Sequence, residues 1–100
     1  MIISSFNYFI KTFKSFDEVI ERANNHELGL SSYICTNSME IAHKASELME
    51  TGTVAVNTPQ VALAEAPFGG IKQAGYGREG GSMAIKDYLN VKYTHLGLKG

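Results

Sequence analysis

The feature that most constrains the fold of this chain is a glycine-rich block at residues 66–81, which holds six of the ten glycines. Glycine has no Cβ, so it can adopt positive φ or let two segments approach closely, and it loses more backbone freedom on folding than any other residue. A stretch this rich in glycine is neither a continuous helix nor a long strand. We interpret it as an ordered loop, a kind of segment that often carries function, between a periodic part and a short tail.

Within this block, Gly75, Gly77 and Gly80 have the spacing G-x-G-x-x-G that is typical of dinucleotide-binding proteins. Such a site also requires a buried strand before the glycines and a helix that opens from them. Residues 71–74 do not have the composition of a buried strand. We therefore interpret the match as a glycine-rich turn that leads into a helix.

The residues before the block alternate between strand-like and helix-like patterns. Ser15 and Glu18 have the spacing of a capping box, in which the two side chains pair with free backbone N–H groups at a helix start. A second helix is predicted to begin after Asn37 or Ser38, and Gly52 stands where a glycine would end it. The predicted elements are a strand at 5–13, a helix at 16–24, a strand at 30–36, the second helix, and a strand at 53–57.

Short links between these elements predict a parallel sheet, because parallel strands need a connection as long as a helix, and the helices supply it. The fold class is therefore α/β, with β-α-β-α-β units in residues 1–65. Residues 58–65 are expected to form a loop at the carboxyl end of the third strand, where α/β proteins place ligands. After the block, residues 82–89 predict a short helix and residues 90–96 a last strand.

Composition argues against several classes of function. A net charge of −1 without a basic patch predicts no nucleic-acid or membrane partner. No apolar run is long enough to span a bilayer and no signal-peptide pattern is present, which predicts a cytoplasmic protein. The single cysteine, Cys35, is predicted to be a buried strand residue rather than a nucleophile. The histidines, His26, His43 and His95, lack the spacing of metal ligands.

Several short motifs resemble, in the right order, the C-terminal segment of NAD(P)-dependent aldehyde dehydrogenases. They are FDEVIERAN (16–24), GLSSY (29–33), GTVAVN (52–57), PFGGIK (67–72) and GYGRE (75–79). The resemblance implies that residues 1–100 are part of a catalytic domain, with an α/β part (1–65), a glycine-rich loop (66–81), and a helix and oligomerisation strand (82–100). Gly80-Gly81 and the ending DYLNVKY (87–93) are most similar to the succinate-semialdehyde dehydrogenase branch.

Two positions depart from the pattern of these relatives. That branch usually carries a serine that holds the substrate carboxylate in the loop before Pro67, but here the loop reads Val61-Ala62-Leu63-Ala64. A second serine of the family, after the motif lysine, is replaced by Ala74. Both changes remove a hydroxyl, and the first puts the carboxylate contact in doubt.

The resemblance implies oxidation of an aldehyde to a carboxylic acid with NAD or NADP, with succinate semialdehyde as one candidate substrate. The cysteine nucleophile, the glutamate base and the cofactor domain would lie earlier in the polypeptide. This chain is therefore expected to bind no cofactor, to be inactive alone, and to supply pocket wall and subunit interface. Two origins stay open: an excised or truncated part of the enzyme, and a stand-alone truncated interaction module that binds full-length subunits.

The residues implied to line the substrate pocket are Phe68, Gln60, Ala62 and Leu63. Phe68 has an alternative role as a core aromatic that anchors the loop. Lys72 and Arg78 are expected to tie the loop down rather than to act on substrate. Residues 90–96 are implied to pair with a neighbouring subunit of a homo-oligomer, because a lone strand leaves a row of unpaired backbone groups.

Overall fold

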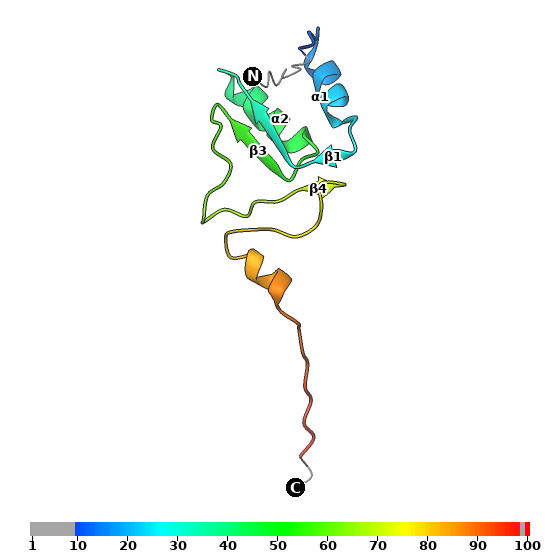
Figure 1. The fold of residues 1–100 in the computed structure, drawn as a ribbon, viewed down its shortest axis with the longest axis vertical. Helices are drawn as coiled ribbons and strands as arrows, with labels where there is room; N and C mark the ends of the chain where they lie inside the picture. The colour runs from blue at the N-terminus through cyan, green and yellow to red at the C-terminus, as the bar shows by residue number, and fades with distance from the viewer. Residues whose placement is uncertain (1–9, 99) are drawn as a thin grey trace, which may run out of the picture.

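The computed structural model describes residues 10–98 and residue 100. Its elements, in chain order, are α1 (Phe16–Asn24), β1 (Leu28–Gly29), β2 (Ser31–Ile34), α2 (Met39–Leu48), β3 (Thr53–Val56), β4 (Ile71–Lys72) and the 3-10 helix η1 (Ala84–Tyr88). Figure 1 shows a body that runs from α1 to β4, followed by η1 and by a tail, residues 89–98, that points away from the body. The radius of gyration of 20.0 Å exceeds the roughly 13 Å of a compact domain of this length because the tail is extended.

Helix α1 begins where the capping box predicts. The Ser15 side-chain oxygen accepts a hydrogen bond from the Glu18 backbone N–H at 3.2 Å, and the Glu18 carboxylate accepts one from the Lys14 backbone N–H at 2.9 Å. The return bond therefore reaches one residue before the N-cap. That bond, followed by the Arg22 guanidinium, holds the pKa of Glu18 below its ordinary value. The predicted helix range is confirmed.

Strands β2 and β3 form the predicted parallel pair, with α2 as the connection between them. Their register runs from Ser31 opposite Thr53 to Ile34 opposite Val56. Of the two predicted N-caps for α2, Ser38 is the one used, since its oxygen accepts a hydrogen bond from the backbone N–H of Ile41 at 3.3 Å. The buried hydrophobic side chains among the described residues are two alanines, Ala45 of α2 and Ala55 of β3, so this core is small.

The end of α2 differs from the prediction. The helix ends at Leu48, well before Gly52, and the Asn24 side-chain amide donates to the Leu48 carbonyl at 2.7 Å. A side chain from the end of α1 therefore satisfies a terminal carbonyl of α2. Gly52 has another role: a Cβ at this position would lie 1.9 Å from the Gly69 carbonyl oxygen, so Gly52 permits a close backbone contact between the start of β3 and the glycine-rich block.

Two predictions about the β-type segments need correction. The first predicted strand, 5–13, lies mostly outside the described residues, and its described part, 10–13, is not a strand. Cys35 is exposed rather than buried. The reason is that β2 ends at Ile34, which leaves Cys35 at the margin of an apolar groove of about 510 Å³ between α1, α2 and β2.

The glycine-rich block contributes a strand that the sequence pattern did not predict. β4 pairs antiparallel with β1, with Leu28 opposite Lys72 and Gly29 opposite Ile71. Each of these strands has two residues, which is too short to show an alternating pattern. The ladder joins the block to the chain just after α1, so the block lies against the body.

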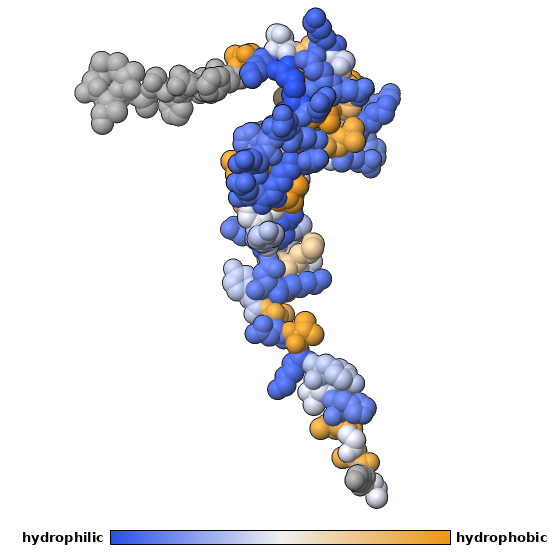
Figure 2. Space-filling view, turned by 90° about the vertical axis from the view of Figure 1, so that its right-hand side faces the viewer, coloured by the Kyte–Doolittle hydropathy of each residue, from blue (hydrophilic) through white to orange (hydrophobic). Residues whose placement is uncertain are grey.

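Residues 82–96, after the glycine-rich block, differ from the prediction in both of their predicted elements. The predicted helix at 82–89 is a 3-10 helix over 84–88, and its first residue has no side-chain cap. The predicted strand at 90–96 forms no ladder within the described part of the chain, because no other described segment lies beside it. Its apolar side chains are exposed, and Figure 2 shows such side chains recurring along the tail. Among residues 10–98, no helix is long and apolar enough to cross a membrane.

Candidate functional site

The candidate site is built on residues 58–81, here called the strap, which run from the end of β3 through β4 to the start of η1. Figure 1 shows the strap leaving β3 along one side of the body and returning across it to β4. Asn57, just before the strap, has φ of 55° and holds the backbone of Thr36 with its side chain. The strap therefore starts where the carboxyl ends of both parallel strands meet, the position at which α/β folds bind ligands.

Phe68 is fixed by reciprocal hydrogen bonds inside the strap. The Phe68 N–H donates to the Glu79 carbonyl, and the Glu79 N–H donates to the Phe68 carbonyl, both at 2.7 Å. A further bond from the Gly81 N–H to the Ala64 carbonyl, at 2.8 Å, closes the folded-back segment. Phe68 is thus held on an ordered backbone, although it lies outside any long strand.

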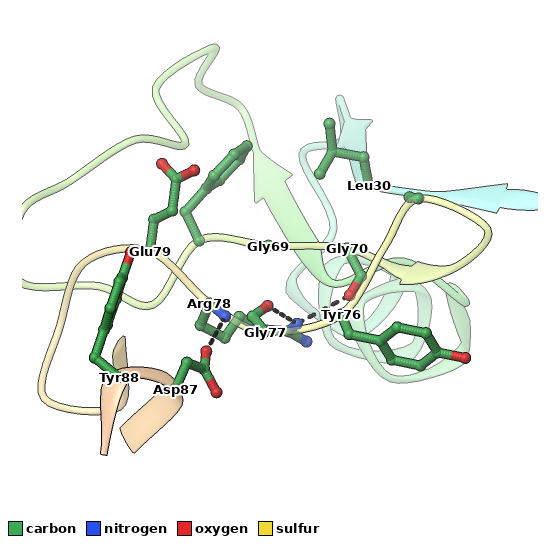
Figure 3. Close-up of a pocket in the computed structure, with 11 residues that line it drawn as sticks. Leu30, Gly69, Gly70, Tyr76, Gly77, Arg78, Glu79, Asp87 and Tyr88 are labelled. Atoms are coloured by element: carbon green, nitrogen blue, oxygen red, sulfur yellow. Dashed lines mark hydrogen bonds between the residues drawn. The ribbon is translucent and has the colours of Figure 1, made fainter. Parts of the chain in front are cut away.

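Arg78 joins two parts of the strap to η1, as Figure 3 shows. Its guanidinium Nη1 donates to the carbonyls of Gly70, at 2.9 Å, and Gly77, at 2.8 Å. Its backbone N–H donates to the Asp87 carboxylate of η1 at 2.8 Å. Arg78 therefore ties the loop down, as predicted, and the Asp87 contact was not anticipated from the sequence.

Lys72 makes a second set of ties, between β4 and the end of α1. Its ammonium group donates to the carbonyls of Asn24, at 2.8 Å, and His26, at 3.3 Å, and it forms an ion pair with Glu50. The φ of Lys72 is 56°, a backbone conformation that residues other than glycine rarely adopt. A cation at the carboxyl end of a helix also interacts favourably with the helix dipole. These contacts confirm the predicted anchoring role.

A cavity of about 530 Å³ lies between the strap, η1 and Leu30, which links β1 to β2. Its lining combines the Phe68 ring and glycine backbone with charged side chains, while Figure 3 shows the Tyr76 ring pointing away from the Arg78 contacts. The lining residues are Leu30, Phe68, Gly69, Gly70, Ala74, Tyr76, Gly77, Arg78, Glu79, Asp87 and Tyr88.

The structure places the four predicted pocket residues on one strap but not in one cavity. Phe68 is half-buried at the cavity, whereas Gln60, Ala62 and Leu63 are exposed on the preceding span and do not line it. Their role as substrate-pocket residues stays a prediction. Sequence reasoning missed Asn57 as a structural residue; the available signal was an asparagine directly after a strand, where left-handed backbone is common.

The glycines at 75, 77 and 80 do not form a dinucleotide cradle. All three have positive φ, but the strand before them is the two-residue antiparallel β4, and the segment after them is a turn followed by a 3-10 helix. A cradle of that kind needs a parallel strand before it and the first turn of an α-helix after it. The glycine-rich block therefore lacks the geometry of a dinucleotide-binding loop. No group of three potential metal ligands comes together in the described ranges.

Comparison with known proteins identifies the family. Residues 8–94 match the aldehyde dehydrogenase family. Among curated relatives, 3-sulfolactaldehyde dehydrogenase of Pseudomonas putida is 49% identical over 85% of this chain and 18% of that protein. The NADP⁺-dependent succinate-semialdehyde dehydrogenase of Escherichia coli is 42% identical over 86% of this chain and 18% of that protein. Among solved structures, the NAD⁺ complex of aldehyde dehydrogenase from Bacillus cereus has a TM-score of 0.77 at 45% identity, covering 80% of this chain and 16% of that one.

These comparisons bear out the resemblance seen in the motifs, including the presence of succinate-semialdehyde dehydrogenases among the relatives. They also show that the chain spans less than a fifth of the length of the relatives it matches. The agreement covers both sequence and fold. The chain belongs to the aldehyde dehydrogenase family.

Proposed function

We propose that this chain forms part of the aldehyde pocket and part of a subunit interface in an NAD(P)-dependent aldehyde dehydrogenase. The enzyme oxidises an aldehyde to a carboxylic acid, and the reacting groups and the cofactor site lie outside this chain. The observation that carries the proposal is the strap, which leaves the carboxyl ends of β2 and β3 and holds Phe68 on a doubly hydrogen-bonded backbone beside a cavity. Ligands of α/β proteins bind at these strand ends.

The hydrogen bonds of the strap support a role in shaping a pocket. Specificity requires side chains held on a preorganised backbone, because a mobile wall would lose entropy each time substrate binds. Phe68 meets this requirement through its pairing with Glu79. The exposed residues Gln60, Ala62 and Leu63 then complete the wall with one polar amide and two apolar side chains.

The side chains of residues 61–64 limit the kind of aldehyde that we expect to bind. The names of two relatives indicate aldehydes with an anionic group, 3-sulfolactaldehyde and succinate semialdehyde. Residues 61–64 of this chain offer neither a hydroxyl nor a cation to such a group. We therefore propose an aldehyde whose tail contacts apolar side chains here, and succinate semialdehyde is a candidate only where other residues hold its carboxylate.

The exposed tail and the single cysteine indicate a partner and a compartment. Val91 and Tyr93 in the tail are exposed, at 100% and 83%, although extended apolar segments are normally covered. We propose that residues 90–96 pair with a second subunit of a homo-oligomer. The cytoplasm is the compartment we propose, since the single Cys35 fits a reducing environment.

A substrate-pocket role can be tested by replacing the matching segment of the E. coli succinate-semialdehyde dehydrogenase with this chain. We expect the chimera to oxidise aldehydes and the chain alone to produce no NAD(P)H. In the chimera, Phe68→Ala should raise KM for the aldehyde, and Phe13→Ala is the matched control because Phe13 is 56% exposed and does not line this cavity. Activity of the chain alone, or equal effects of the two substitutions, would contradict the proposal.

The exposed tail also favours a second candidate function, a stand-alone module that binds full-length subunits of the family. Adding the purified chain to the complete E. coli enzyme distinguishes the two. A module should form mixed complexes and change the activity in proportion to the chain added. Sedimentation that shows the enzyme and the chain as separate species would exclude this function for that partner.

A further inference from the structure

The backbone leaves the parallel sheet at Asn57 in an unusual way. Its N–H continues the ladder by donating to the Ile34 carbonyl at 2.8 Å, but its φ of 55° then turns the chain out of the strand. Lys72 is the other residue besides glycine with positive φ in the described part of the chain. Asparagine tolerates this conformation better than most residues because its short polar side chain can hydrogen-bond locally.

The Asn57 side chain takes over the pairing that its backbone abandons. Its Nδ2 donates to the Thr36 carbonyl at 2.8 Å, and its Oδ1 accepts from the Thr36 N–H at 2.9 Å. A side-chain amide has the same donor and acceptor as a peptide group, so it can substitute for the next residue of the ladder. The turn therefore leaves neither polar group of the Thr36 backbone unpaired.

The span that follows has few other constraints. Within residues 58–62 of the described chain, the hydrogen bond that forms is a local one, from the Gln60 N–H to the Thr58 hydroxyl oxygen at 3.1 Å. The next tie to another segment is the bond from the Gly81 N–H to the Ala64 carbonyl. The span with Gln60 and Ala62 is thus fixed at its two ends, and Asn57 sets the direction in which it starts.

We propose that Asn57 is a positioning residue for the substrate pocket. The hydrogen bonds of its side-chain amide to Thr36 and its left-handed backbone together direct residues 58–63 toward the aldehyde. Asn57 thereby controls aldehyde affinity without touching substrate. The inference rests on the pocket role proposed above for this span. It adds a residue, and a geometric reason, that the motif match does not supply.

The first arm of the test measures the bonds themselves in the chain. Asn57→Gly removes both side-chain bonds while keeping positive φ accessible, and Asn57→Asp keeps the acceptor and loses the donor. Amide hydrogen exchange at Thr36 should accelerate about tenfold in Asn57→Gly, as expected for loss of a bond of ordinary strength. Asn90→Gly in the tail is the control. Unchanged exchange at Thr36 in Asn57→Gly would overturn the inference and leave the pocket role intact.

The second arm measures catalysis in the chimera described above. Asn57→Gly should raise KM for the aldehyde about tenfold, with kcat changed less than about twofold and the KM for the cofactor unchanged. The aldehyde KM of Asn57→Asp should lie between those of the unsubstituted chimera and Asn57→Gly. A merely structural role would lower the amount of active enzyme, and therefore kcat, without this split. An unchanged aldehyde KM in Asn57→Gly, with KM raised in Phe68→Ala, would overturn the inference alone. Unchanged KM in both variants would overturn the pocket role as well.

Discussion

The contact between Gly52 and the strap gives a prediction whose size can be worked out from the structure. A Cβ on Gly52 would lie 1.9 Å from the Gly69 carbonyl oxygen, 2.8 Å from the Gly69 carbonyl carbon and 2.9 Å from the Gly70 Cα. All three atoms belong to backbone, so no side-chain rotation can relieve the overlap. Gly70 is itself buried, and Gly52 is held by its N–H bond to the Gly29 carbonyl at 3.0 Å.

Gly52→Ala should therefore separate the strap from the start of β3. Overpacking commonly costs about 1–3 kcal/mol, and a backbone overlap this short places the substitution at about 3 kcal/mol or more. Since domains are stable by about 5–15 kcal/mol in total, this is a large fraction of the free energy of unfolding. With a urea m-value of about 1–3 kcal/mol per molar, the unfolding midpoint should fall by roughly 1 M or more.

Urea unfolding followed by circular dichroism measures this shift, and two glycines serve as controls. Gly97→Ala should change stability by less than about 0.5 kcal/mol, because a Cβ added at this position in the extended tail would meet no atom within 4 Å. Gly75 also has open space but a φ of +113°, so Gly75→Ala isolates the backbone term, about 1 kcal/mol. A midpoint for Gly52→Ala equal to that of Gly97→Ala would refute the close contact.

Ion pairs, a helix cap, the pocket span and the tail each give a further prediction. Lys72→Met should destabilise the chain by about 2 kcal/mol in urea unfolding, because two charged hydrogen bonds and an ion pair are lost. Lys44→Met, which breaks an exposed i,i+4 pair that solvent screens, should leave the urea midpoint nearly unchanged. Because the folded-state pKa of Glu18 is lowered, its contribution to α1 is complete above the ordinary value of 4.5 and is lost as pH falls through the folded pKa; Glu18→Gln should therefore show a smaller loss of helical circular dichroism on acidification. In the chimera, Ala62→Phe should lower kcat/KM for long aldehydes more than for short ones, by a factor that corresponds to about 1–3 kcal/mol of transition-state binding. Equal losses for all aldehyde lengths would contradict a pocket role. Sedimentation should show concentration-dependent association of the chain that is weakened by Tyr93→Pro or by ending the chain at Leu89, and equally monomeric species would rule out the tail as the contact.

The sequence by itself determined the features that depend on neighbouring residues. The start of α1 follows from Ser15 and Glu18, three residues apart, and the parallel pairing of β2 and β3 follows from the short links on either side of α2. Spaced motifs also identified the family, because several short words in a fixed order rarely match by chance. In each case the information lies within one element or one connection, so an ordered pattern of side chains is enough to predict it.

The tertiary structure decided the features that join distant parts of the chain. Lys72 caps the end of α1 from 48 positions away, and the Asn24 side chain reaches the end of α2 across 24 positions. The close approach of Gly52 to Gly69 and the side-chain hydrogen bonds from Asn57 to Thr36 likewise join residues that are far apart in the sequence. No local pattern specifies which backbone groups such residues will meet.

The tail also shows what a side-chain pattern alone cannot determine. The alternation at residues 90–96 predicts a strand, yet a strand is stabilised by a partner ladder, and no described segment of the chain supplies one. Side-chain pattern therefore determined that the segment is extended. Whether it becomes part of a sheet depends on a second set of backbone donors and acceptors, which only a tertiary or quaternary contact can provide.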